Sequence, residues 1–86
     1  DSLMLARRVA EIMTEHGWRI ENIDATILCQ RPKLAPHIPA MRAKLAEAFR
    51  MPVVAVSVKA TTEEHLGFTG EGLGIAAHAV ALIEAV

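Results

Sequence analysis

The stretch Val53–Leu73, VVAVSVKATTEEHLGFTGEGL, organises the rest of this 86-residue chain. It begins with valine at every second position, which predicts a short strand with one apolar face. That face carries Val54, Val56 and Val58, and the other carries Ala55, Ser57 and Lys59. Two threonines, two glutamates and a glycine-rich loop follow, and glycine lets backbone amides approach a ligand closely. A strand that ends in these groups is suited to holding phosphate oxygens together with a hard metal ion.

The segment before this stretch predicts a helix and a strand. Asp1 and Ser2 offer an N-cap, and a helical apolar spacing runs from there to Gly17, where the helix should end. The apolar residues are Leu5, Val9, Ile12 and Met13. From Trp18 the period changes to two, which predicts a strand whose apolar face is Ile23, Ala25, Ile27 and Cys29. Cys29 is then expected to be a small buried residue rather than a reactive thiol.

Two more helices complete the prediction. Pro36 and Pro39 open a second helix, because amides of the first turn have no intrahelical partner. Its expected buried residues are Ile38, Met41, Leu45, Ala48 and Phe49, and its expected solvated residues are Arg42, Lys44, Glu47 and Arg50. A helix between two strands implies a parallel pair with a right-handed crossover. The segment 74–85 is predicted to be a last helix, with Ile75, Val80, Leu82 and Ile83 for packing.

Composition limits the classes of partner. The net charge is −1, so the overall balance suggests neither nucleic acid nor an anionic membrane as a partner. No apolar run reaches the length of a membrane span. Hydrophobic residues make up 52% of the chain, which is typical of an oligomer subunit or, equally, of a plain alanine-rich helical sequence.

Two motifs resemble a known family. KATTEEHLGFTG at 59–70 and DATILCQRPKLAPHIPAM at 24–41 resemble the C-terminal half of 2-C-methyl-D-erythritol 2,4-cyclodiphosphate synthases, and the likeness runs from Asp1 to Val86. The resemblance implies an α/β (α+β) fold, a two-layer domain with a mixed sheet covered by helices. Residues 1–86 would be one domain, an α-β-α-β-α fragment of a homotrimeric fold whose N-terminal part, with its zinc-binding Asp-x-His pair and further His, is missing.

The same resemblance implies a reaction and a location. This family of lyases cyclises 4-diphosphocytidyl-2-C-methyl-D-erythritol 2-phosphate and releases CMP, in non-mevalonate isoprenoid biosynthesis. Its cofactors would be zinc, held by the missing part, and magnesium or manganese. The sites would lie between subunits, with a small-molecule nucleotide diphosphate as the substrate. We expect a bacterial cytoplasmic location if no targeting segment precedes Asp1, and a plastid location stays open.

The resemblance also assigns roles to residues of this chain. The cytidine pocket would lie along 29–35, with Lys33 facing phosphate. Thr62 would stabilise the transition state, and Glu64 would bind magnesium or manganese. Glu63 stands at a position where the family varies. The complete substrate-binding set is Cys29, Gln30, Arg31, Pro32, Lys33, Leu34, Ala35, Ala60, Thr61, Thr62, Glu63, Glu64 and Phe68.

One departure separates the chain from the family pattern. Glu71 and Leu73 stand where the family usually has Arg and Glu. In the family, these two side chains line the central channel of the trimer. A ring of Glu71 would repel a diphosphate there. Two alternatives to the enzyme stay open: a non-catalytic CMP-binding domain, and an oligomerisation module. Lys33, Thr61, Thr62 and Glu64 together favour the enzyme over the module, because a module does not need them.

Overall fold

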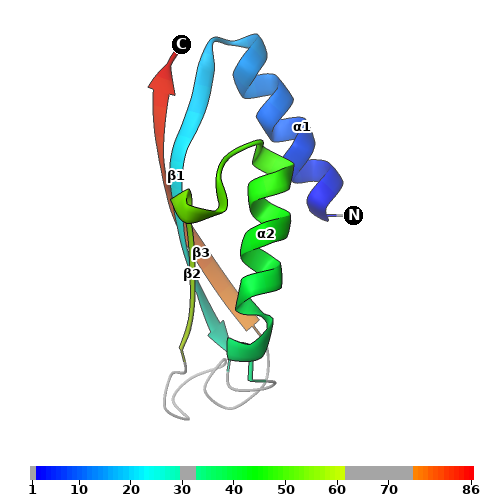
Figure 1. Cartoon of the computed structure of the whole chain (residues 1–86), viewed down its shortest axis with the longest axis vertical. Coiled ribbons are helices and arrows are strands. Elements are labelled where there is room, and N and C mark those ends of the chain that lie inside the picture. The colour runs from blue at the N-terminus through cyan, green and yellow to red at the C-terminus, as the bar shows by residue number, and fades with distance from the viewer. Residues whose placement is uncertain (1, 30–32, 62–74) are drawn as a thin grey trace.

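The computed structural model describes residues 2–29, 33–61 and 75–86, which form two α-helices and three strands (Figure 1). Two short 3₁₀ turns, η1 and η2, precede α2 and β2. The elements in chain order are α1 (Ser2–Glu15), β1 (Trp18–Cys29), η1 (Ala35–His37), α2 (Ile38–Phe49), η2 (Val53–Ala55), β2 (Val56–Thr61) and β3 (Ile75–Ala85).

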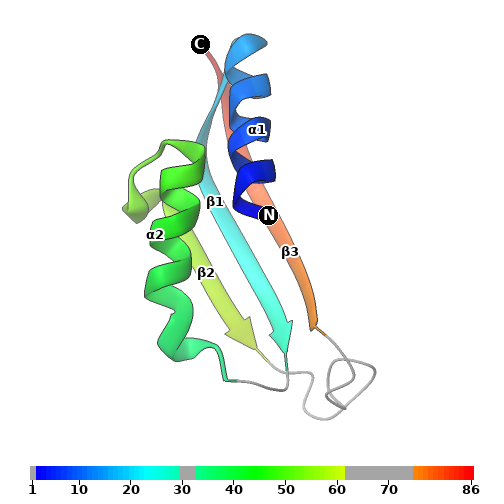
Figure 2. The same cartoon turned by 90° about the vertical axis from the view of Figure 1, so that its right-hand side faces the viewer.

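The three strands form one mixed sheet in the order β2-β1-β3. β1 pairs with β2 in parallel, as predicted for strands joined through a helix, and with β3 antiparallel. Both helices lie on the same face of the sheet (Figures 1 and 2). The other face is not covered by any described element. The predicted two-layer α+β architecture with a mixed sheet is therefore confirmed.

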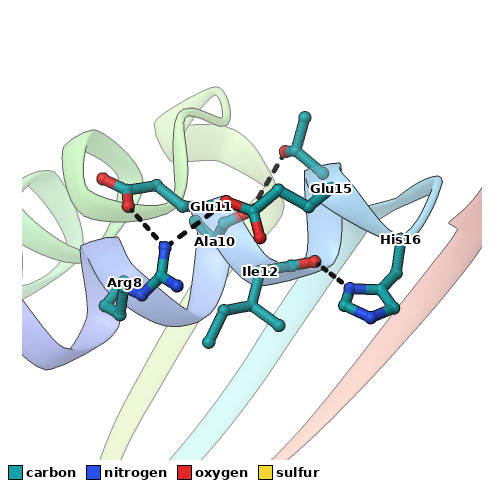
Figure 3. A network of polar contacts seen from close by, with 7 residues as sticks. Arg8, Ala10, Glu11, Ile12, Glu15 and His16 are labelled. Atoms are coloured by element: carbon teal, nitrogen blue, oxygen red, sulfur yellow. Dashed lines mark hydrogen bonds and ion pairs between the residues drawn. The ribbon is translucent and has the colours of Figure 1, made fainter.

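The first helix begins and ends close to the predicted residues. Gly17 has a φ of +80°, and its amide donates a 3.1 Å bond to the Thr14 carbonyl oxygen, so a left-handed glycine ends α1. The His16 ring donates from Nδ1 to the Ile12 carbonyl oxygen at 2.8 Å (Figure 3). Along the exposed side of the helix, Arg8 bonds Glu11 and Glu15 at 3.0 and 3.4 Å (Figure 3). These contacts join residues of α1 and of the turn that ends it, so they stabilise the helix itself rather than its packing on the sheet.

The core lies between α2 and the strands β1 and β2. Val56 and Val58 are 1% and 8% exposed and pack with Ala46 of α2. Ile38, Met41 and Leu45 pack against this cluster, and Ala48 is buried, as the helical spacing predicts. Cys29 is also buried, so the expectation that it is a packed residue is confirmed. One α-helix and two strands thus share an aliphatic core.

The predicted C-terminal helix is wrong, because Ile75–Ala85 is strand β3. Five of its eleven residues are alanine, which favours a helix when the segment is considered alone. However, β1 has a second edge whose amides and carbonyls need partners, and β3 supplies them over its whole length from Ile75 to Ala85. The order is therefore α-β-α-β-β rather than α-β-α-β-α.

Two smaller expectations about side-chain placement are also wrong. Val54 is 84% exposed rather than on the apolar face, because it lies in η2, where the strand alternation has not begun. Arg42 was expected on the solvated side of α2, but it is half-buried and bonds the backbone carbonyls of Val53 and Val56. Both differences involve the same turn at the start of β2.

Candidate functional site

The described candidate residues meet at one edge of the sheet. β1 ends at Cys29 and β2 ends at Thr61, which pairs with Leu28. Ile75, the first residue of β3, pairs with Cys29 at this same edge (Figure 2). Because parallel strands run in the same direction, the C-terminal ends of β1 and β2 lie side by side. Open α/β sheets bind ligands at such carboxyl ends.

The strand end itself is buried, whereas most of the other described candidate residues are exposed to solvent. Cys29 is buried, while Leu34 is half-buried. Lys33, Ala60 and Thr61 are exposed, as is Ala35 at the start of η1. An exposed lysine and an exposed hydroxyl beside a packed strand end could contact a phosphorylated ligand without first breaking a buried contact. The remaining predicted site residues lie outside the described residues: Gln30, Arg31, Pro32, Thr62, Glu63, Glu64 and Phe68.

Lys59, the first residue of the motif at 59–70, lies beside a carboxylate. It forms an ion pair with Asp24 on the sheet face away from the helices. Asp24 lies opposite Ser57 in the parallel register, so the lysine reaches it diagonally across the two strands. A neighbouring carboxylate offsets the lysine's charge, and Lys59 is therefore a weaker candidate for binding phosphate than Lys33. The sequence alone does not predict this ion pair, because the pair depends on the register of β1 against β2.

A cavity of about 400 Å³ lies away from this edge. Its walls include Met13 of α1, Trp18 at the start of β1, and Phe49 and Arg50 at the end of α2. Trp18 and Cys29 are the two ends of the same twelve-residue strand. The cavity therefore lies at the opposite end of the sheet from the predicted nucleotide-binding residues.

The described residues contain neither a metal-ligand cluster nor a membrane-spanning helix. In residues 2–29, 33–61 and 75–86, no three His, Cys, Asp or Glu side chains gather closely enough to hold a metal ion. No helix in this part of the chain has the length and apolar character needed to cross a membrane.

The fold defines a class of protein: a two-layer α+β unit with a mixed three-stranded sheet. The particular family follows from comparison with known proteins. The profile of the YgbB family matches residues 1–84, and the chain belongs to that family.

Several relatives carry the same enzyme name. The 2-C-methyl-D-erythritol 2,4-cyclodiphosphate synthase of Thioalkalivibrio sulfidiphilus is 60% identical over 84 residues, which are 98% of this chain and 52% of the relative. The synthase of Azotobacter vinelandii is 55% identical over 86 residues, 100% of this chain and 55% of the relative. The chain thus spans about half the length of these curated relatives.

A solved structure supports the fold. The crystal structure of 2C-methyl-D-erythritol 2,4-cyclodiphosphate synthase from Plasmodium vivax matches with a TM-score of 0.96 and 26% identity. The match covers 100% of this chain and 57% of the other. The family resemblance and the mixed-sheet fold expected from the sequence are both confirmed.

Proposed function

We propose that this chain supplies the cytidine-diphosphate side of a 2-C-methyl-D-erythritol 2,4-cyclodiphosphate synthase site. The supporting observation is the pairing of Leu28 with Thr61, which places the C-terminal ends of β1 and β2 side by side. The relatives that share 55% and 60% of its residues are named for this enzyme. The reaction is the cyclisation of 4-diphosphocytidyl-2-C-methyl-D-erythritol 2-phosphate with release of CMP.

The chemistry needs positioned groups more than a protein nucleophile. The 2-phosphate of the substrate attacks the β-phosphorus of its own diphosphate, a P–O bond forms, and CMP leaves with the electrons of the broken P–O bond. A protein accelerates such a step by fixing the two phosphates and by stabilising the charge that develops between them. In this proposal residues 29–35 hold the cytidine, Lys33 faces phosphate, and the hydroxyls of Thr61 and Thr62 donate hydrogen bonds to the diphosphate.

The metal ions of the proposal are not held by the described residues, which form no ligand cluster. We assign the zinc ligands to a part of the protein outside this chain, and we assign magnesium or manganese to Glu64, which lies outside the described residues. When bound, these cations would neutralise phosphate charge.

The proposed assembly is a homotrimer, and the uncovered sheet face supports it. Val80 and Leu82 of β3 are 74% and 58% exposed, and they flank Ala81, which pairs with the buried Ile23, so they lie on the face away from the helices. Exposed apolar residues on one face commonly mark a protein interface. In the full-length protein, Val80→Asp should lower the mass measured by analytical ultracentrifugation, whereas Val54→Asp, at an exposed turn position, should not. An unchanged mass for Val80→Asp would refute this interface.

The test of the reaction is phosphorus NMR with the full-length gene product, zinc, magnesium and the diphosphocytidyl substrate. We expect CMP and a cyclic diphosphate to appear. Glu64→Gln should abolish most turnover while it leaves CMP binding nearly intact, because the cation that Glu64 would hold would neutralise charge on the diphosphate. Glu47→Gln removes a carboxylate whose described contact is an exposed ion pair with Arg7, and it should leave both properties unchanged.

Two outcomes would contradict the proposal. A full-length protein that binds CMP without turnover would be a non-catalytic nucleotide-binding domain. A protein that neither turns over substrate nor binds CMP, yet assembles, would be an oligomerisation module. Equal loss of turnover and CMP binding in Glu64→Gln would refute the separate metal role of that residue.

A further inference from the structure

The Arg42 side chain connects α2 to the chain that enters β2. Its Nε donates a hydrogen bond of 2.6 Å to the carbonyl oxygen of Val56, and its Nη2 donates one of 3.0 Å to the carbonyl oxygen of Val53. Hydrogen bonds from a charged donor are stronger than neutral ones, and the planar guanidinium fixes the directions of both. One rigid group on the helix therefore holds two backbone positions.

The two acceptors lie on either side of the turn that starts the strand. Val53 is the first residue of η2 and Val56 is the first residue of β2. The turn has its own bonds, from the Ala55 amide to the Pro52 carbonyl oxygen at 3.0 Å and from the Val56 amide to that of Val53. The local bonds shape the turn, and among the described residues the charged side chain that attaches it to the helix layer is Arg42.

The sequence of β2 does not by itself fix its register. Valines at 54, 56 and 58 have the period of a strand, so a slip of two residues would put Val54 at the place of Val56 and Val56 at the place of Val58. The same face would stay apolar. At a rise of about 3.3 Å per residue, however, Thr61 would move about 7 Å beyond its pairing with Leu28.

The other described restraints on this register are weak. In the described sheet β2 is an edge strand that pairs only with β1, over six residues. The ion pair between Lys59 and Asp24 joins side chains that are 54% and 59% exposed, and exposed pairs contribute little. The apolar packing of Val56 and Val58 against α2 does not select the register either, because a slip of two residues keeps a valine at both places.

We infer that Arg42 is a positioning residue: it fixes the register of β2 and so holds Thr61 beside Leu28 at the candidate site. The catalytic consequence rests on the proposed function, whereas the register itself does not. The two acceptors flank a turn whose own hydrogen bonds fix its place in the sequence, so a slip of two residues would carry this turn about 7 Å away from the guanidinium and break both bonds.

The test uses three variants of the full-length protein. Arg42→Met keeps the aliphatic stem but removes every donor, and Arg42→Lys keeps the charge as a single ammonium group. Lys44→Met is the matched control, because it removes a cation from an exposed position of the same helix. Methyl-labelled NMR reports the register, since Val58 pairs with Ala25 and would pair with Ile27 after the slip.

In the wild type and Lys44→Met, we expect the strongest cross-strand methyl contact of Val58 to be with Ala25. In Arg42→Met this contact should shift toward Ile27, with kcat/KM about 100-fold lower, because a misplacement of ångströms at a reacting centre has an effect of that size. Arg42→Lys should be intermediate in both readouts.

An Arg42→Met protein with a lower Tm but an unchanged Val58 contact and unchanged kcat/KM would overturn the inference, because Arg42 would then serve stability alone. If Arg42→Met does not fold, Arg42→Lys decides by the same two readouts. A wild-type protein without turnover would refute the proposed function, and the methyl contact of Val58 would still decide the register role.

Discussion

Arg50 ends α2 in a backbone conformation that suits glycine. Its φ and ψ are 56° and 48°, in the left-handed region, and its amide bonds the Ala46 and Glu47 carbonyl oxygens. The next amide, of Met51, bonds the Ala46 carbonyl oxygen at 2.9 Å, so the whole C-cap depends on this conformation. Arg50→Gly should therefore stabilise the protein.

The magnitude follows from two opposing terms. A side chain in the left-handed region is disfavoured by roughly 1–2 kcal/mol, which the glycine relieves. Glycine also gains freedom in the unfolded chain, which costs about 0.5–1 kcal/mol. The expected net stabilisation is about 0.5–1 kcal/mol, or a rise in Tm of roughly 1–4 °C for a domain of 150–250 residues.

The assay is thermal and chemical unfolding of the full-length protein at one fixed concentration, because association changes the apparent Tm. Arg50→Ala is the matched control, since it removes the same side chain and keeps the strained conformation. Gly17→Ala is the reverse change: at φ +80°, with nothing within 4 Å of the added Cβ, it should cost about 1 kcal/mol through the backbone alone. An Arg50→Gly protein no more stable than Arg50→Ala would refute the reasoning.

Three further expectations concern the core, the site and the acid response. Val56→Ala should lower the free energy of unfolding by about 2–3 kcal/mol, measured by urea titration, because Val56 is 1% exposed in the core. Lys33→Ala should weaken CMP binding in calorimetry, and an unchanged affinity would contradict its proposed place at the phosphate. The neighbouring Glu84 carboxyl, which can donate a hydrogen bond to Glu21 when it is protonated, and the guanidinium of Arg19 lower the pKa of Glu21 from its ordinary 4.5. The stabilising contribution of Glu21 is therefore complete above about pH 4.5 and is lost as the pH falls through the lower folded value. Arg19→Met should reduce this acid loss of Tm, and an identical pH profile would show that the ion pair contributes nothing.

The candidate site was only partly accessible to prediction. The position of Thr61 beside the end of β1 follows from the sequence, because two strands joined through a helix run parallel and end on the same side. The ion pair of Lys59 with Asp24 does not follow, because it needs the exact alignment of β1 and β2. The Arg42 bonds also depend on tertiary structure. Helical spacing places Arg42 toward solvent, but the turn before β2 lies against that side of α2, and its carbonyl oxygens accept hydrogen bonds from the guanidinium.

The sequence by itself determined the elements that carry their own periodic signal. Helical spacing with Gly17 as the end predicts α1, alternation predicts β1 and β2, and the prolines mark the start of α2. Only the tertiary structure decided the state of Ile75–Ala85. An alanine-rich apolar run has no period that separates helix from strand, and the open edge of β1, whose backbone groups needed hydrogen-bond partners, made it a strand.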